Sequence, residues 1–281
     1  MKIGNTDINS LKIGNTSINK VYIGADKVWP NESLVLDGLS NSTCGFSLRK
    51  LKSSYSGSAI RVRRSNDNAE QDIGFVNDQL DTSSLNTFCS GYDGFVDTWY
   101  NQIDTSNNAI QTASSNQPKI YDASTGCELE NGKPAIKFVK ANSNWLEVSD
   151  NTFGNIGDAK SNFSVFKVNS GTTFFPHIFS KAYGLSGTIS VNLSSNGTRI
   201  DVYVDNIYMF KQVGSDIRGS QSLISNINKD GSFQPNNLKL YLNSSLISTQ
   251  TSGNSLSGTN TTKFAIGRNN RDSTYYIDGT I

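Results

Sequence analysis

Aromatic and amide side chains are the residues of this 281-residue chain best suited to binding a ligand. Trp145 follows Asn144 in "ANSNW", and Tyr183 precedes a glycine. Proteins hold a sugar by stacking an aromatic ring on its C–H face and by bonding its hydroxyls with planar amides and carboxylates. The sequence therefore predicts a carbohydrate-binding surface that includes Trp145, Tyr183 and Asn144. The alternative is that these rings are buried in a core.

His177, in "FFPHIFSK", is the only histidine of the chain. With no second imidazole and no cysteine near it in the sequence, neither a Ser-His-Asp triad nor a zinc site is indicated. Its place in an apolar strand favours a structural role.

The segment "NINKDGSFQPNN" fits the first half of a calcium loop through Asn226, Asn228 and Asp230. The twelfth position, where a bidentate glutamate is needed, is Asn237. An Asp-Gly hairpin turn explains the same residues and is the preferred interpretation. The sequence predicts no cofactor, although a calcium ion held by distant loops remains an open alternative.

A cluster of charges follows the first strongly alternating segment, "SAIRVRRSNDNAEQD". Its basic residues are Arg61, Arg63 and Arg64, and its acidic residues are Asp67, Glu70 and Asp72. Because Arg61 and Arg63 are two positions apart on a strand, they share one face. We predict an ion-pair and hydrogen-bond network that fixes a loop, and consider polyanion binding the lesser alternative.

Short apolar runs recur about every ten residues from residue 95 onward, separated by turns such as "SNGT" and "LNSS". This spacing is typical of sandwiches and jelly rolls. We predict an all-β fold, a β-sandwich (jelly roll) over residues 31–281, with short helices at 43–57 and 81–91. Its strand pattern resembles that of concanavalin A-like and laminin-G-like sandwiches. The final "TYYIDGTI" indicates a strand without a closing turn. We expect a sandwich truncated at its C-terminus, or else a last strand that completes an edge with another chain.

The first thirty residues repeat with a period of ten, and Gly4, Gly14 and Gly24 mark the repeat. Each glycine follows an isoleucine, which predicts very short strands joined by tight turns. Units this small bury a hydrophobic face only by stacking or docking. Residues 1–30 are therefore predicted to form a β-repeat module for attachment and oligomerisation.

The charge balance excludes partners that act through bulk charge. The chain has 25 Lys and Arg against 24 Asp and Glu, a net charge of +1, so we expect no nucleic-acid partner. The first residues contain no long apolar run, so we expect neither a signal peptide nor membrane insertion. The odd number of cysteines, three, favours reduced thiols.

Two stretches, "FSLRKLKSSYSGSAIRVRRSNDNAEQDIGF" and "FCSGYDGFVDTWYNQ", resemble a segment of bacteriophage tail and virion-associated proteins. That segment is itself similar to the start of the fungal α-L-arabinofuranosidase B catalytic domain. "QPKIYD" and "NGKPAIKF" continue the resemblance, which covers about residues 40 to 140. The opening repeat also resembles the N-termini of phage tail proteins.

The resemblance to a glycosidase raises the question of catalysis. Retaining hydrolysis needs two carboxyl groups about 5 Å apart. In the arabinofuranosidase family the nucleophilic glutamate follows a vicinal cysteine pair, whereas this chain has no such pair and no glutamate after Glu147. The family's aspartate after the tyrosine is also replaced, by Asn101 after Tyr100. We therefore expect no enzyme activity.

These observations together predict a phage virion protein, assembled in the host cytoplasm, of the tail-fibre, head-fibre or decoration type. The resemblance implies other virion proteins as partners of the N-terminal repeats and host surface polysaccharide as the ligand of the sandwich. A homo-oligomer is expected, because many linked weak sites give useful avidity. The alternatives are a virion protein that binds no sugar and a glycoside hydrolase or depolymerase related to arabinofuranosidase.

Overall fold

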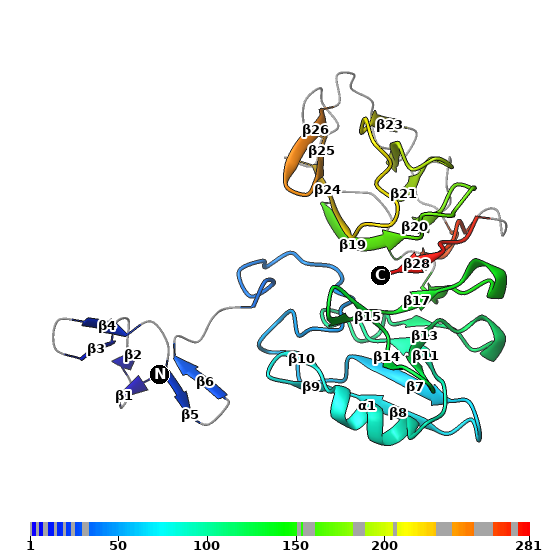
Figure 1. Ribbon diagram of the computed structural model, residues 1–281. Helices are drawn as coiled ribbons and strands as arrows, with labels where there is room; N and C mark the ends of the chain where they lie inside the picture. Colours follow the sequence, from blue (N-terminus) through cyan, green and yellow to red (C-terminus); the bar gives the residue numbers. More distant parts are fainter. Residues whose placement is uncertain are drawn as a thin grey trace.

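The computed structural model describes residues 34–150, 153, 161–181, 189–204, 207–228, 238–249, 261–270 and 275–281, and short strands between residues 2 and 29 (Figure 1). Tyr183 and Asp230 lie outside the described residues. No helix in these ranges is long and apolar enough to cross a membrane.

The N-terminal repeat forms three β-hairpins, each a separate two-stranded antiparallel sheet. They are β1 (Lys2–Ile3) with β2 (Thr6–Asp7), β3 (Leu11–Ile13) with β4 (Thr16–Ile18), and β5 (Val21–Ile23) with β6 (Asp26–Trp29). The strands agree with the prediction of short strands at a ten-residue period.

The rest of the chain is an antiparallel sandwich of two layers joined at β11 (Gly94–Trp99), which confirms the all-β prediction. The first layer runs, in order of pairing, β8 (Glu70–Ile73), β7 (Ile60–Arg64), β11, β13 (Lys119–Asp122), β17 (Lys137–Phe138), β28 (Gly279–Thr280), β19 (Asn162–Val168), β24 (Ser222–Asn228), β25 (Leu238–Leu242) and β26 (Ser245–Thr249). The second layer runs β12 (Ala109–Ile110), β18 (Leu146–Val148), β27 (Ala265–Ile266), β20 (His177–Lys181), β21 (Ile189–Leu193), β22 (Arg199–Val204) and β23 (Ile207–Gln212).

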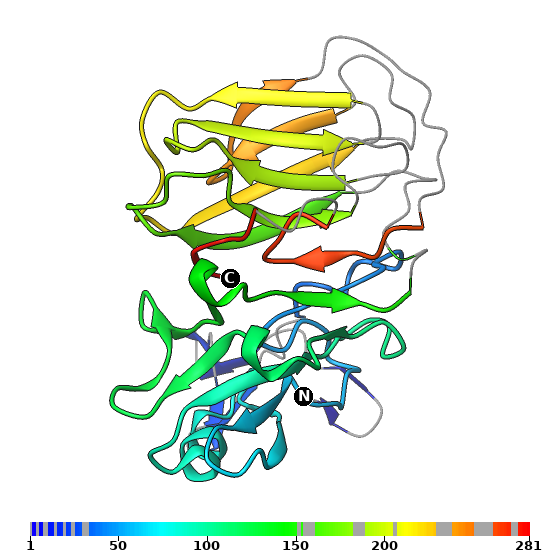
Figure 2. The same ribbon diagram turned by 90° about the vertical axis from the view of Figure 1, so that its right-hand side faces the viewer.

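Small elements decorate the loops of the first half. They are the hairpin β9 (Phe75–Val76) with β10 (Gln79–Leu80), β14 (Gly126–Cys127) on β13, the hairpin β15 (Leu129–Glu130) with β16 (Lys133–Pro134), α1 (Thr82–Cys89), and the 3-10 turns at Ser114–Asn116 and Lys140–Asn142. Figure 1 places α1 and β23 at opposite ends of the sandwich, and Figure 2 shows the sandwich turned by 90°.

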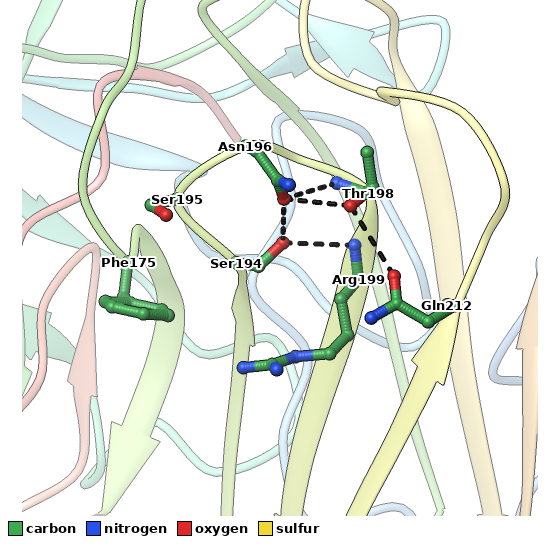
Figure 3. A pocket seen from close by; sticks show the side chains of 7 residues that line it. All are labelled: Phe175, Ser194, Ser195, Asn196, Thr198, Arg199 and Gln212. Atoms are coloured by element: carbon green, nitrogen blue, oxygen red, sulfur yellow. Dashed lines mark hydrogen bonds between the residues drawn. The ribbon is translucent and has the colours of Figure 1, made fainter.

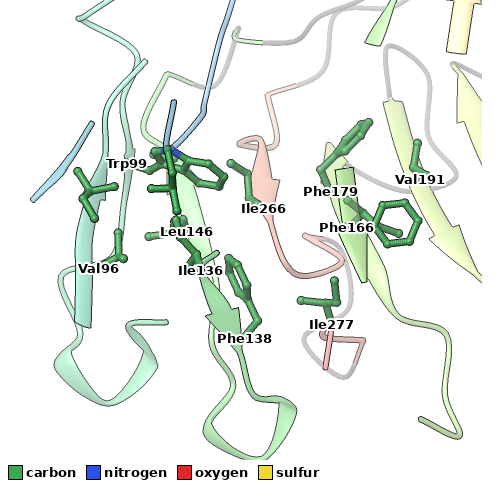
Figure 4. Close-up of a cluster of buried hydrophobic side chains, with 14 of the residues drawn as sticks. Val96, Trp99, Ile136, Phe138, Leu146, Phe166, Phe179, Val191, Ile266 and Ile277 are labelled. Carbon is green, nitrogen blue, oxygen red and sulfur yellow. The ribbon is translucent and has the colours of Figure 1, made fainter. Parts of the chain in front are cut away.

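The core is one continuous cluster between the two layers (Figure 4). Phe166 comes from the first layer, and Phe179 and Val191 come from the second. Phe179 stacks on Phe264 with ring centroids 5.6 Å apart. Apolar burial of this kind is the main stabilising term of such a fold.

Of the two predicted helices, the second is confirmed and the first is wrong. Asp81 caps α1, since its carboxylate accepts the Ser84 N–H at 3.0 Å. Residues 43–57 are irregular instead, because buried amides from another segment satisfy their backbone. Asn101 accepts the Gly45 N–H at 3.0 Å, and Gln102 accepts the Leu51 N–H at 2.7 Å.

The last strand, β28, is a central strand of the first layer. It pairs with β17 on one side and with β19 on the other. The alternative that it completes an edge with another chain is therefore wrong, and truncation of the sandwich stays a prediction. At Gly279 a Cβ would collide with the carbonyl oxygen of Lys167, so the two backbones meet where only glycine fits.

Candidate functional site

The second layer carries polar side chains on the face turned away from the core. In its register Ser180 lies opposite Ser190, and His177 lies opposite Asn192, which lies opposite Asp201 on β22. Residues that face each other across antiparallel strands share one face of the sheet. These five side chains therefore line a single face, here called the polar face.

All five residues of the polar face are at most 2% exposed, although they are polar. The hydroxyls of Ser180 and Ser190 and the amide oxygen of Asn192 have no hydrogen-bond partner. More than about 90% of buried polar groups in proteins are paired with protein or ordered water. Three atoms on adjacent strands therefore keep a hydrogen-bonding capacity that no described protein group uses.

Asp201 is the carboxylate of the polar face. Its Oδ1 lies 2.8 Å from Nε of Arg199, and its Oδ2 accepts Nη2 of Arg199 at 3.1 Å and Nδ2 of Asn192 at 3.2 Å. The Asp201 side chain is 2% exposed, whereas that of Arg199 is 30% exposed. The partly exposed guanidinium of Arg199 thus neutralises the buried negative charge of Asp201.

His177 is fixed at the other side of the polar face. Its Nδ1 lies 3.1 Å from the carbonyl oxygen of Phe175, and its ring centroid lies 5.9 Å from that of Tyr275. The backbone contact holds the imidazole in place.

A pocket of about 190 Å³ opens at the turn between β21 and β22 (Figure 3). It is lined by Phe175, Ser194, Ser195, Asn196, Thr198, Arg199 and Gln212. Asn196 Oδ1 accepts the Ser194 hydroxyl at 2.8 Å and the Thr198 hydroxyl at 2.9 Å, so the turn holds itself in shape. The pocket is small compared with the roughly 300–1,000 Å³ of typical ligand sites, which suits a single small ring.

Two residues that line the pocket contact residues of the polar face. Arg199 lines the pocket and holds Asp201, and Phe175 lines the pocket and contacts His177. Phe175 is 38% exposed, which leaves apolar surface for stacking. The arrangement offers an aromatic ring, amides, hydroxyls and one neutralised ion pair to a ligand.

Glu147 lies on the same side of the second layer but far from Asp201. It stands opposite Ala265, which stands opposite Ser180, so four strand spacings separate β18 from β22. At 4.7–4.9 Å each this is roughly 19 Å, against the 5–9.5 Å or so between the two carboxyls of a glycosidase. Glu147 and Asp201 therefore do not form such a pair.

Two of the predicted ligand residues hold the protein itself together. The Arg268 guanidinium lies 3.3 Å from the Trp145 ring centroid, and also bonds Glu147 at 3.1 Å. Asn144 is buried, its Oδ1 accepting the Val139 N–H at 2.9 Å and its Nδ2 donating to Gln117 O at 3.1 Å. One face of Trp145 is therefore covered, and both ends of the Asn144 amide have partners.

The predicted charge network lies on β7 and β8, on the other layer. The Arg61 guanidinium pairs with Asp72 at 2.8 Å, Arg64 with Asp67 at 2.6 Å, and Arg63 donates to Gln117 at 2.6 Å and to Asn68 at 2.9 Å. Glu70 faces Arg63 in the register of β7 and β8 and is exposed. The hydrogen bond from Arg61 lowers the pKa of Asp72.

Of the weak calcium candidates, Asn226 and Asn228 lie on β24, and Asn226 faces Asn162 on β19. The amide atoms of Asn226 and Asn162 are buried without a hydrogen-bond partner. Within the described ranges, no three His, Cys, Asp or Glu side chains are grouped to hold a metal ion.

Of the residues that form the polar face and the pocket, only His177 was singled out from the sequence. The sequence feature that points to these strands is the alternation in "ISVNL" and "RIDVYV", where every second residue is apolar. That pattern predicts a strand with one solvated face, and so Asp201 and Asn192 look like surface residues.

No family model and no curated protein matches the chain. Among solved structures, a mutant GH54 α-L-arabinofuranosidase soaked with 4-nitrophenyl α-L-arabinofuranoside is 15% identical, with a TM-score of 0.58 over 84% of this chain and 56% of its own. An arabinofuranosidase complexed with arabinofuranosyl-α-1,2-xylobiose is 14% identical, with a TM-score of 0.55 over the same shares. A GH54 enzyme soaked with a cyclic sulfate inhibitor is 16% identical, with a TM-score of 0.56 over 84% and 58%.

These likenesses establish the fold and confirm, at the level of fold, the resemblance to arabinofuranosidases. The chain spans a little over half the length of these enzymes. The expectation that the chain is not an enzyme is contradicted, because these three solved structures with a similar fold are arabinofuranosidases. That expectation rested on the lack of a glutamate at the position of the family's nucleophile.

Proposed function

We propose that this chain recognises carbohydrate, with the polar face and the adjoining pocket of β21 and β22 as its ligand site. The observation that carries the proposal is the set of unpaired buried atoms on Ser180, Ser190 and Asn192. Hydroxyls and amides in such a position are satisfied when a ligand brings its own hydroxyls, and a sugar carries one on nearly every carbon.

The charge of the site favours a neutral sugar. Arg199 is the cation of the pocket and is already bonded to Asp201, which leaves no net charge there for an acidic ligand. Phe175 supplies the stacking surface that a sugar ring needs.

A second candidate function is hydrolysis of an α-L-arabinofuranoside, favoured by the likeness to GH54 enzymes. Asp201 is the carboxylate of this site and is the residue to test for a role in the reaction. Hydrolysis would release 4-nitrophenol from 4-nitrophenyl α-L-arabinofuranoside, so both functions can be measured with one compound.

The biological setting follows from the sequence resemblance alone. We propose a virion protein whose sandwich is displayed to the surface polysaccharide of a host bacterium, and whose N-terminal hairpins attach it to the particle. If binding experiments detect no glycan, the conclusion is a virion protein that does not bind sugar.

The test is titration of the full chain with 4-nitrophenyl α-L-arabinofuranoside and with host polysaccharide, with and without a calcium chelator, while absorbance reports 4-nitrophenol. Asn192→Leu keeps the side-chain size but removes the amide, and should weaken binding at least about tenfold, since a lost buried bond of about 1.5 kcal/mol is that factor. Asn226→Leu is the matched control, because Asn226 is also buried and unpaired but lies on the first layer.

Saturable binding that Asn192→Leu weakens and Asn226→Leu leaves intact supports the site. An equal loss of affinity in both variants would show that the ligand binds elsewhere. The absence of binding to the wild type would overturn the proposal. Nitrophenol release that Asp201→Asn abolishes would establish the hydrolase.

A further inference from the structure

The three N-terminal hairpins are too small to be stable by themselves. Their strands have two to four residues, and each hairpin is its own two-stranded sheet. An isolated hairpin is at best marginally stable in water, and three or more strands or a packed partner are needed. Within the part of the chain that the structure describes, no hairpin strand joins the sheet of the sandwich.

Among the described strands, each hairpin strand pairs only with the other strand of its own hairpin. In a two-stranded sheet each strand bonds on one side, so the other side presents free N–H and C=O groups. Such an edge is satisfied by another strand. The sandwich does not supply that strand among the described residues, because its own strands pair with one another.

The three hairpins present nearly the same edge three times. The register pairs Ile3 with Thr6, Ile13 with Thr16 and Ile23 with Asp26. The sequences "KIGNTDIN" and "KIGNTSIN" differ at one position. A second copy of the chain carries the same repeated strands at the same spacing in the sequence. Each hairpin of one copy can therefore find an equivalent hairpin on the other.

The charges also favour a like partner. The hairpins carry both signs, and Lys2 stands opposite Asp7 in β1 and β2. Residues 2–29 carry four lysines and two aspartates, so pairing that brings a lysine of one copy to an aspartate of another is favoured by charge.

We propose that the hairpins pair, edge to edge, with the same hairpins of further copies of this chain, so that residues 2–29 form a shared sheet. The assembly is a homo-oligomer built at its N-terminal end, with one sandwich displayed per copy. This inference does not depend on what the sandwich binds.

The test measures the mass of the full chain in solution by light scattering. The wild type should have twice 30.6 kDa or a higher multiple. Leu11→Asp with Ile18→Asp places two carboxylates directly opposite each other in β3 and β4, and should reduce the mass to that of one copy. Lys12→Ser in the same hairpin is the control and should keep the wild-type mass.

A second measurement does not rely on a variant. Isotopically light and heavy copies are mixed and cross-linked through lysines, and peptides joining Lys12 of a light chain to Lys12 of a heavy chain are expected. A wild-type mass of 30.6 kDa, an unchanged mass for the Asp variant, or cross-links only within single chains would each overturn the proposal.

Discussion

Arg199 holds Asp201 from the same strand, with Nε 2.8 Å from Oδ1 and Nη2 3.1 Å from Oδ2. The two residues lie two positions apart on β22 and therefore on one face. One end of this pair reaches the open pocket and the other reaches the polar face. The pair connects the surface of the proposed site to its interior.

Replacing Arg199 with alanine should destabilise the protein by about 3 kcal/mol, because the buried Asp201 carboxylate then loses the guanidinium that contacts both of its oxygens. Urea unfolding of the full chain measures this change. Arg61→Ala is the control: its pair with Asp72 has side chains 41% and 40% exposed, so the loss should stay below about 1 kcal/mol. Equal losses would contradict the idea that Asp201 depends on Arg199.

Gly279→Ala should destabilise the fold severely, because a Cβ would meet the carbonyl of Lys167 and neither backbone can move without breaking β28 from β19. The measurement is the thermal unfolding temperature and the soluble yield. Gly74→Ala is the control, since a Cβ there meets nothing within 4 Å. A Gly279→Ala protein as stable as this control would show that β28 does not hold the layer together.

The sequence predicts this fold well where periodicity and composition decide it. The all-β class, the hairpin repeat and α1 with its Asp81 cap all follow from local patterns. The prediction of a helix over residues 43–57 was wrong. Leu48 and Tyr55 are buried at a spacing typical of a helix, but the segment that carries them is not helical. The conformation of this segment is set by residues distant in the chain. The side-chain amides of Asn101 and Gln102 accept the backbone N–H groups that a helix would bond internally.

The candidate site was harder to predict for a related reason. In a sequence, the signal for sugar binding is an aromatic residue such as Trp145, but one face of the Trp145 ring is covered by Arg268. Ser190 and Asn192 carry no signal in one sequence, because polar residues that alternate with apolar ones normally face solvent. Their burial depends on tertiary packing that local patterns do not encode.

The three cysteines should differ in reactivity. Burial raises the pKa of Cys89 and that of Cys127 to about 11 each, so both remain protonated near pH 8, whereas Cys44 is exposed. A colorimetric thiol reagent should titrate one thiol quickly in the folded chain and all three in denaturant. Rapid loss of all three without denaturant would contradict the burial of Cys89.

Asp122 should make the stability of the turn after β13 depend on acid pH. The backbone N–H of Ser124 and the ammonium of Lys119, each 3.0 Å away, lower the pKa of Asp122 from 3.8 to about 2. The unfolded chain therefore binds more protons than the folded chain between about pH 4 and pH 2, and stability falls as the pH falls through that window. Above it, the contribution of Asp122 is fully present.

Asp122→Asn keeps an oxygen for the Ser124 N–H but removes the charge. Its unfolding temperature should lie below that of the wild type above about pH 5 and approach it near pH 2, where the wild-type carboxyl is itself being protonated. Asp78→Asn is the control, because Asp78 is exposed and its carboxylate accepts no hydrogen bond among the described residues. If the gap between Asp122→Asn and the wild type stayed constant with pH, the ionised form of Asp122 would not be what stabilises the turn.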